Sequence, residues 1–280
     1  MIIDGRKIAK EIIETLKTEV ASLSEQPKLV DIVVGENSVT ESYVGIKQRR
    51  AEEVGIEFII ERFPENVTEK DLLYRVLEIQ KDPNLAGLLI QLPLPDQINK
   101  NTLLNAIELR FDVDGLTDQN TKMLYAGSPQ FIPATAGAIM ELINSCELTQ
   151  DLNGMPVAVI GSGDLVGKPV AFMLKQRGAE VTVVNRSTSN INEICKRSKL
   201  IVSGAGSPGL LTSEMVSEGV VVIDAGTAES DGGITGDVDF DSVSLKASYI
   251  TPVPGGVGPV TVAMLLKNTV QSAKARSTKI

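Results

Sequence analysis

Apolar and polar positions in the first 95 residues follow two patterns, one helical and one typical of buried strands. Residues 5–23 carry apolar side chains at helical spacing, which predicts an amphipathic helix. Short apolar runs predict strands at 28–35, 57–63 and 85–95, separated by a helix that carries Tyr43 and Lys47 and by a helix over 68–80 with Thr68 as its N-cap. This β-α-β-α-β order predicts parallel strands joined by crossover helices.

The second half of the chain begins a new pattern of the same kind. After the helical stretch "ATAGAIMELINSC", residues 152–188 read as strand, glycine-rich turn, helix and strand. "KLIVSGAGSP" and "GVVVIDAG" predict further strands of the same sheet, and the last long helix is expected over roughly 258–275. The sequence therefore predicts an α/β protein with two sheets.

Composition excludes several classes of function. The 280 residues are 42% apolar, enough for a sizeable core, and the net charge of −9 disfavours a nucleic-acid or anionic-membrane surface. No apolar run approaches the ~18 residues of a membrane span, and the charged N-terminus does not resemble a signal peptide. Cys146 and Cys195 are far apart and form no metal or disulfide pattern, so we expect a reduced, cytoplasmic setting in which both are structural.

The chain contains no histidine. The commonest acid–base residue near neutral pH is therefore absent, and a Ser-His-Asp triad is excluded. Catalysis must rely on Lys, Tyr, Asp or Glu, on a cofactor, or on positioning alone.

"GSGDLVG", from Gly161 to Gly167, lies between a Val/Ile strand and a helix. Such a turn lets backbone N–H groups and a helix N-terminus approach a pyrophosphate. Its spacing is one residue longer than the Rossmann fingerprint, and a merely tight strand–helix turn is the alternative.

The end of the next strand reads "VVNRST", without the Asp or Glu that usually holds an NAD ribose. Arg186 with Ser187 and Thr188 suits a 2′-phosphate better, which favours NADP, although Arg186 could also be a solvated loop charge.

Tyr43 and Lys47 share one helix face, just after a strand–helix junction. Gln91 ends the third strand, and "DVDG" places two carboxylates, Asp112 and Asp114, beside a turn glycine, where one of them could hold a polar heterocycle. A lysine partly removed from water near a tyrosine and an amide can act as acid or base. A solvated surface lysine remains the alternative.

The stretch 250–270, "ITPVPGGVGPVTVAMLLKNTV", places prolines and glycines before a helix. It could be a connector, or a backbone wall against a flat ligand.

Together these motifs resemble the bifunctional methylenetetrahydrofolate dehydrogenase/methenyltetrahydrofolate cyclohydrolase family. The resemblance rests on "IIDGRKIAKEI", "YVGIK", "AEEVGI", "GLLIQLPLP", "DVDGLT", "GSGDLVGKP", "VIDAG", "GDVDF" and "TPVPGGVGPVTVAMLLKNT", which span nearly the whole chain. It implies NADP-dependent oxidation of 5,10-methylenetetrahydrofolate, then hydrolysis of the methenyl product to 10-formyltetrahydrofolate. It also implies a homodimer, and a folate cleft between a catalytic domain (1–137 plus 264–280) and a Rossmann-like domain (138–263).

The resemblance also implies residue roles. Lys47 matches the lysine that assists hydrolysis, Tyr43 the tyrosine that stacks on folate, Gln91 the glutamine that tunes the lysine, and Asp114 the aspartate that grips the pterin. The implied substrate contacts add Leu92, Pro93, Pro254, Gly255 and Gly256. The implied cofactor contacts are Thr135, Gly161, Ser162, Gly163, Val166, Gly167, Arg186, Ser187, Thr227 and Thr261.

Several positions depart from the family pattern. Ser162 and Gly163 stand where an arginine and a serine are usual, and Asn185–Arg186 replaces a His-Ser pair. We interpret this as an arginine relocated to the strand end. "PATA" at 133–136 lacks the usual cysteine and second proline, Thr40 stands in place of serine, and Phe111 in place of lysine.

Three other functions are compatible with parts of the sequence. A monofunctional dehydrogenase and a catalytically silent folate- or dinucleotide-binding regulator are disfavoured by the retained Lys47 and Gln91. A shikimate-type dehydrogenase would explain the glycine turn and "VNRST", but not "QLPLP" or "TPVPGGVGP".

Overall fold

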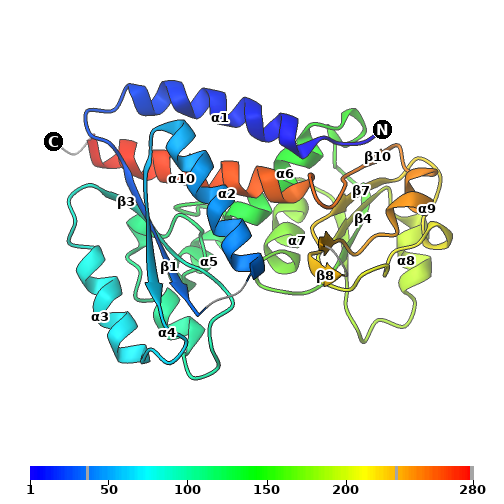
Figure 1. Ribbon diagram of the computed structural model, residues 1–280. Coiled ribbons are helices and arrows are strands. Elements are labelled where there is room, and N and C mark those ends of the chain that lie inside the picture. Colours follow the sequence, from blue (N-terminus) through cyan, green and yellow to red (C-terminus); the bar gives the residue numbers. More distant parts are fainter. Residues whose placement is uncertain (36–37, 231–232, 278–280) are drawn as a thin grey trace. The chain divides into compact units, whose positions relative to one another are not determined.

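The computed structural model describes residues 1–35, 38–230 and 233–277, and Figure 1 shows the ribbon. The contacts divide the chain into two compact units, Lys10–Ala134 with Val262–Ile280, and Met1–Ala9 with Thr135–Thr261. We call them the lysine unit and the glycine-turn unit. The family resemblance implied that residues 1–9 belong to the catalytic domain, whereas in the structure their contacts group them with the glycine-turn unit. No helix in the described part of the chain is both long and apolar enough to cross a membrane.

The lysine unit contains a three-stranded parallel sheet. Its strands are β1 (Lys28–Val34), β2 (Glu57–Phe63) and β3 (Leu85–Ile90), in the order β2-β1-β3. The three strands and their parallel pairing confirm the sequence prediction. β1 is central and buried along most of its length, so its side chains meet protein on both faces.

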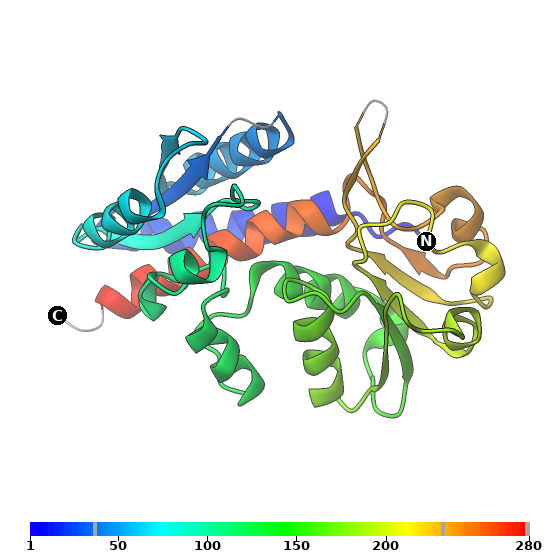
Figure 2. The ribbon, with the colours of Figure 1, turned by 90° about the horizontal axis from the view of Figure 1, so that it is seen from below.

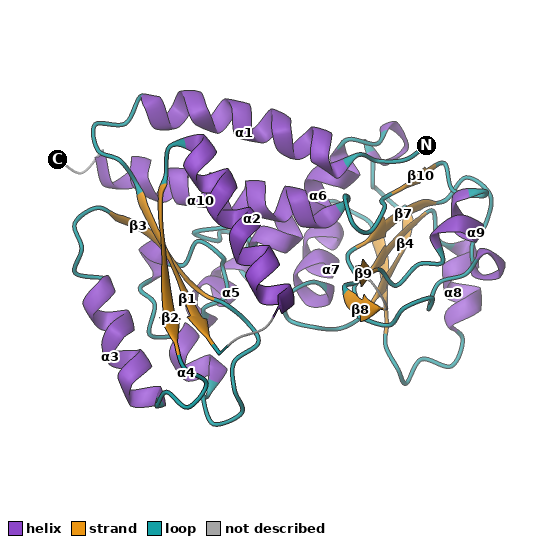
Figure 3. Ribbon diagram, in the orientation of Figure 1, coloured by secondary structure: helices purple, strands orange, loops and turns teal. Residues whose placement is uncertain are grey.

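Helices cover both faces of this sheet. The chain crosses from β1 to β2 through α2 (Ser38–Val54), and from β2 back past β1 to β3 through α3 (Glu69–Ile79). Because both crossovers are right-handed, the two helices lie on opposite faces of the sheet, as Figure 3 shows. Thr68 caps α3 by accepting a hydrogen bond from the Asp71 amide, as predicted. The helical elements are α1 (Gly5–Ala21), α2 (Ser38–Val54), α3 (Glu69–Ile79), α4 (Lys100–Leu104), the 3-10 turn η1 (Leu109–Phe111), α5 (Asp118–Tyr125) and the C-terminal part of α10 (Val257–Ser277).

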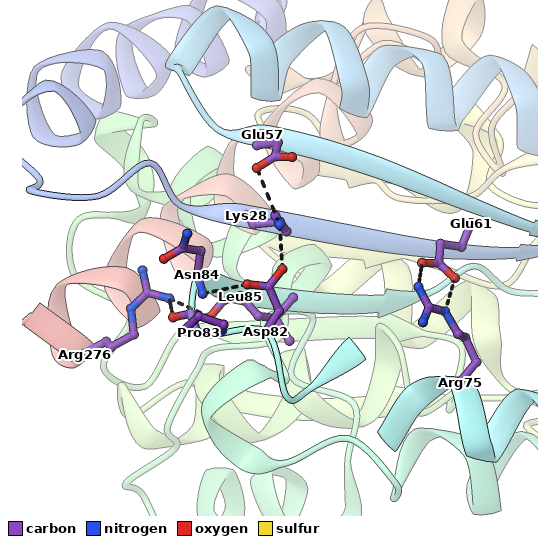
Figure 4. Close-up of polar contacts among 9 residues, drawn as sticks. All are labelled: Lys28, Glu57, Glu61, Arg75, Asp82, Pro83, Asn84, Leu85 and Arg276. Atoms are coloured by element: carbon purple, nitrogen blue, oxygen red, sulfur yellow. Dashed lines mark hydrogen bonds and ion pairs between the residues drawn. The ribbon is translucent and has the colours of Figure 1, made fainter. Parts of the chain in front are cut away.

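Ion pairs and carbonyl contacts tie the amino ends of the strands to their surroundings (Figure 4). Lys28 Nζ at the start of β1 lies 2.5 Å from Asp82 Oδ2 and 3.8 Å from Glu57 Oε2. Arg276 near the end of α10 donates to the carbonyls of Pro83 and Leu85 at 2.6 and 3.1 Å, which anchors that helix beside β3.

The glycine-turn unit contains a five-stranded parallel sheet in the order β10-β7-β6-β4-β5. Its core includes Ile160, Ile201 and Val222 on the strands and Ile194 and Val243 on the helices. The strands are β4 (Pro156–Ile160), β5 (Glu180–Val184), β6 (Leu200–Ser203), β7 (Val221–Asp224) and β10 (Tyr249–Ile250). The helical elements are α6 (Ala134–Asn144), η2 (Glu147–Thr149), α7 (Gly167–Gln176), α8 (Ile191–Arg197), η3 (Ser213–Met215) and α9 (Phe240–Ser244).

A small antiparallel hairpin, β8 (Ala228–Ser230) with β9 (Gly233–Thr235), was not predicted. It extends away from the parallel sheet, as Figure 2 shows.

The chain changes direction across this sheet between β4 and β6. From β4 it goes outward to β5, then returns to β6 and continues to β7 and β10. In open parallel sheets a ligand crevice forms at such a switch point, beyond the carboxyl ends of the two strands. The glycine turn that begins at Gly161 follows β4 directly, and therefore lies at this switch point.

Candidate active site

Lys47 lies on α2 and is only 4% exposed. Its helix face points inward because Val44 and Ala51, three residues before it and four after, are also buried. A buried ammonium needs compensating partners, since removing it from water is costly. The reading of Lys47 as a solvated surface charge is therefore wrong.

Two side-chain oxygens accept hydrogen bonds from Lys47 Nζ. Gln91 Oε1 lies at 2.7 Å, and Asp31 Oδ2 at 2.5 Å. Gln91 follows β3, and its backbone N–H still donates to Ile32 of β1, which fixes the position of its side chain beside that strand. The pairing of Lys47 with Gln91 agrees with the sequence analysis, but Asp31 was missed.

Asp31 lies in the middle of β1 and is fully buried. Burial raises the pKa of its carboxyl, while Lys47 and the more remote Arg62 act in the opposite direction. One signal in the sequence could have found it. A single acid within the apolar run "KLVDIVV", on a strand expected to be covered on both faces, requires a buried cationic partner.

Tyr43 is half-buried on the same helix, with its ring centroid 5.7 Å from Lys47 Nζ. Burial, and then the negative charges of Asp114 and Asp31, raise the pKa of its hydroxyl well above the ordinary range. Tyr43 therefore stays a neutral phenol, able to present its ring and a hydrogen bond to a ligand.

The two carboxylates of "DVDG" have different roles. Asp112 is buried and accepts hydrogen bonds from the amides of Leu116 and Thr117, so it holds the turn together. Asp114, half-buried, makes no side-chain hydrogen bond within the described part of the chain, and its carboxylate is available to a ligand. Its pKa is raised to about 6, chiefly by burial and then by Asp112 and Asp31, with Lys47 opposing.

The glycine turn has the close backbone packing that a dinucleotide site requires. A Cβ on Gly167 would lie 2.2 Å from the Gly161 carbonyl oxygen, and Gly161 itself has a φ of +107°. Ser162 and Gly163 are exposed, and the N-cap residue of α7, Val166, makes no side-chain capping hydrogen bond. These residues fit the pyrophosphate of a nicotinamide dinucleotide, whose phosphates favour an open helix N-terminus.

Arg186 follows β5 on an exposed turn. The Asn185 side chain organises this turn by accepting from the Ser187 amide at 3.0 Å and from the Ser187 hydroxyl at 2.6 Å. No hydrogen bond or ion pair holds the Arg186 guanidinium within the described ranges, so it is free to meet a phosphate.

The remaining predicted cofactor residues lie in the same unit. Val166 precedes α7, Thr227 is exposed beyond β7, and Thr135 is half-buried in the first turn of α6. Thr261 in α10 already donates its hydroxyl to the Val257 carbonyl at 3.1 Å.

The predicted substrate residues fall into two groups. Leu92 and Pro93 follow Gln91 in the lysine unit, joined by a cis peptide bond, and are half-buried and exposed respectively. Pro254, Gly255 and Gly256 belong to the glycine-turn unit and lead into α10. The structure thus brings Tyr43, Lys47 and Gln91 together.

Comparison with known families shows to which family the chain belongs. Residues 3–114 match the catalytic domain of the family described as tetrahydrofolate dehydrogenase/cyclohydrolase, and residues 133–277 match its NAD(P)-binding domain. The chain belongs to this family. The resemblance drawn from the sequence, and the two-domain α/β fold that it implies, are thereby confirmed.

Individual members resemble the chain over its whole length. The bifunctional protein FolD of Nautilia profundicola is 43% identical over 277 residues, which are 98% of this chain and 97% of that protein. The crystal structure of the bifunctional enzyme FolD from Campylobacter jejuni is 40% identical, with a TM-score of 0.94 over 99% of each chain. FolD of Trypanosoma brucei, solved with NADP cofactor and an inhibitor, is 38% identical, with a TM-score of 0.94 over 100% and 99% of the two chains.

Proposed function

We propose that this chain oxidises 5,10-methylenetetrahydrofolate by hydride transfer to NADP and then hydrolyses the methenyl product to 10-formyltetrahydrofolate, within one-carbon metabolism. Membership of the dehydrogenase/cyclohydrolase family supports both activities. The observation that carries the proposal is the buried Lys47, hydrogen-bonded to Gln91, because a buried proton-bearing group is what the hydrolysis requires.

The oxidation needs orientation rather than an acid–base residue. Bound at the glycine turn, NADP would supply the acceptor for a hydride from the methylene bridge of the substrate. The protein contributes the glycine turn that receives the pyrophosphate, together with Tyr43 and Asp114, which hold the pterin. Because the oxidation needs no acid–base residue, a chain without histidine can catalyse it.

The hydrolysis needs one proton-handling group. Water adds to the methenyl carbon, and both of its hydrogens must leave the oxygen before the formyl group is complete. Lys47 can take one of these protons when its amine is neutral, and Gln91 Oε1 helps to hold Nζ in place.

The test follows the absorbance of the methenyl compound with wild type and Lys47→Met. We expect Lys47→Met to slow enzymatic hydrolysis by about 100-fold or more, and to reduce NADP within about threefold of the wild-type rate. Lys122→Met changes an exposed lysine of α5 in the same unit and should match wild type. Hydrolysis by Lys47→Met at the wild-type rate would refute the role of Lys47.

For the cofactor, Arg186 supports NADP over NAD, as its guanidinium can pair with the 2′-phosphate. We expect Arg186→Ala to raise the KM for NADP about tenfold or more and to leave that for NAD within about twofold. The control is Arg177→Ala, at the opposite end of α7 from the glycine turn. An unchanged NADP-to-NAD ratio in Arg186→Ala would refute this assignment.

We also propose a homodimer, on the resemblance to the family. Sedimentation equilibrium should then give twice the 29.9 kDa mass of the chain, and a mass of one chain at micromolar concentration would refute it.

A further inference from the structure

The site holds one titratable group that the proposed steps above do not use. Asp31 is 0% exposed, and its Oδ2 accepts from Lys47 Nζ at 2.5 Å. Its other oxygen, Oδ1, is buried and meets no hydrogen-bond partner among the described residues. A carboxylate that only held the lysine in place would be expected to satisfy both oxygens, because an unpartnered buried oxygen costs stability.

The charged and titratable groups around Asp31 come from every neighbouring element. Lys47 and Tyr43 project from α2, Arg62 from β2, and Asp114 from the turn after η1. Lys47 is the only cation of this group that contacts Asp31 within the described ranges. Asp31 and Lys47 therefore form a neutral pair, with Asp114 the remaining carboxylate nearby.

Stability alone gives little reason for such a pair. Replacing a buried ion pair by apolar side chains of similar size is often neutral or stabilising. The neighbours of Asp31 in β1, Val30 and Ile32, are buried apolar residues, so the same position could have held another one. An acid here is better explained by what it does to Lys47.

We propose that Asp31 is a positioning residue for the hydrolysis step, one that takes a proton from Lys47 and so lets Lys47 accept a proton from the attacking water. This inference rests on the proposed cyclohydrolase function. Geometry supports it, since the donor and acceptor atoms are 2.5 Å apart, and burial favours the protonated form of the carboxyl.

The step balances in atoms and electrons. The water oxygen forms a bond to the methenyl carbon, and one C=N electron pair of the amidinium moves onto nitrogen. One water proton goes to Lys47 Nζ, which has passed one of its own to Asp31 Oδ2. An oxygen lone pair then forms the second carbon–oxygen bond as the carbon–N5 bond breaks. The electron pair of the broken bond stays on N5 and takes up the other water proton, and one proton leaves the Asp31–Lys47 pair for solvent.

The experiment compares Asp31→Asn and Asp31→Ser with wild type. Both variants keep an oxygen that can accept a hydrogen bond from Lys47, and neither can take up a proton. We expect kcat for methenyl hydrolysis to fall by about 10- to 100-fold with KM changed less than about threefold. We expect the pH profile of hydrolysis to shift, and NADP-dependent oxidation to stay within about twofold.

Asp82→Asn is the matched control. It removes the carboxylate charge from a second Lys–Asp contact of the same 2.5 Å length, between Asp82 and Lys28 at the amino end of the same strand (Figure 4). Hydrolysis, oxidation and both pH profiles should remain those of wild type. A shift in Asp82→Asn equal to that in Asp31→Asn would show a general effect of charge and overturn the proposal.

The other possible results also decide whether the proposal stands. Wild-type pH profiles and rates in Asp31→Asn would overturn the proposal, as would an equal loss of both activities in a folded Asp31→Ser. Failure of both variants to fold would show that Asp31 acts in folding alone. Absence of methenyl hydrolysis by wild type would instead refute the proposed function, and Lys47→Met run in parallel separates these cases.

Discussion

Gln91 turns its amide oxygen toward Lys47 and its amide nitrogen toward the backbone. Oε1 accepts from Lys47 Nζ at 2.7 Å, while Nε2 donates to the carbonyl of Leu92 at 2.8 Å. Because an ammonium only donates and a carbonyl only accepts, this is the one orientation in which both contacts are satisfied. The contact to Leu92 therefore holds the acceptor that Lys47 needs.

Gln91→Leu removes that acceptor at nearly constant volume. We expect hydrolysis to slow about tenfold, because Lys47 is then held by Asp31 alone. The free energy of unfolding should fall by about 1 to 3 kcal/mol, the usual cost of losing a hydrogen bond to a buried charged group. Gln97→Leu, the same change at an exposed position of the same unit, is the control. Equal effects of the two substitutions on hydrolysis would contradict the assignment.

Asp114 should make stability depend on pH. Its pKa is raised from 3.8 to about 6 in the folded protein, so the folded state binds a proton more tightly than the unfolded state. Stability is therefore highest when the carboxyl is protonated, falls as the pH rises from about 4 to about 6, and stays lower above that range.

Asp114→Asn avoids this ionisation. Its free energy of unfolding at pH 7.5 should exceed that of wild type by about 1 to 3 kcal/mol, since one pKa unit corresponds to 1.36 kcal/mol. The difference should shrink to near zero by about pH 4, as thermal unfolding at a series of pH values would show. A difference that stays constant across the series would mean that Asp114 is not the group responsible. Substrate affinity should fall in the same variant if Asp114 grips the pterin.

Sequence patterns predicted the frame of the site because regular spacing predicts regular elements. The run 28–35 predicted β1, the Tyr43–Lys47 spacing predicted one face of α2, and the end of β3 placed Gln91 at the ligand edge of the sheet. Asp31 was missed because a pattern of apolar residues treats one acid inside a strand as an interruption. Which side chain faces it depends on the packing of α2 against β1, and that is a tertiary relationship.

For the same reason, the sequence patterns did not predict a pair of buried acids in the glycine-turn unit. Asp224 and Asp237 lie in "VIDAG" and "GDVDF", motifs that the sequence analysis used only for the family resemblance. In the structure, Asp224 accepts from the amides of Gly226, Asp237 and Val238 at 2.9 to 3.1 Å. Burial and the neighbouring Asp237 charge raise the pKa of Asp224. Such links across the chain leave no periodic signal.

Asp237 should be essential to the shape of the loop that follows β6. Its carboxylate accepts from the Ser203 hydroxyl and from the amides of Ala205 and Ser207, each at 2.7 Å. Asp237→Asn puts an N–H donor against one of these donors, so we expect a loss of about 2 to 4 kcal/mol in the free energy of unfolding. NADP affinity should also weaken, as titration of cofactor fluorescence would show.

Asp239→Asn is the control for that change. Asp239 is exposed and accepts from the Ser242 hydroxyl, so its substitution should alter stability by less than about 0.5 kcal/mol. Equal stabilities of the two variants would show that the three hydrogen bonds of Asp237 contribute little.

Gly167 is where the glycine turn tolerates a side chain least. A Cβ there would lie 2.2 Å from the Gly161 oxygen and 2.7 Å from its carbonyl carbon, both of them backbone atoms that cannot move without displacing the turn. We expect Gly167→Ala to lower the free energy of unfolding by about 3 kcal/mol or more and to abolish NADP binding. Gly258→Ala is the matched control, since its added Cβ would meet no other described residue within 4 Å, its chain neighbours and its own helix backbone apart, and alanine favours the helix. Chemical denaturation of the two variants should therefore give opposite signs, a loss for Gly167→Ala and no loss or a small gain for Gly258→Ala. Wild-type stability and NADP affinity in Gly167→Ala would mean that the turn does not need this close approach.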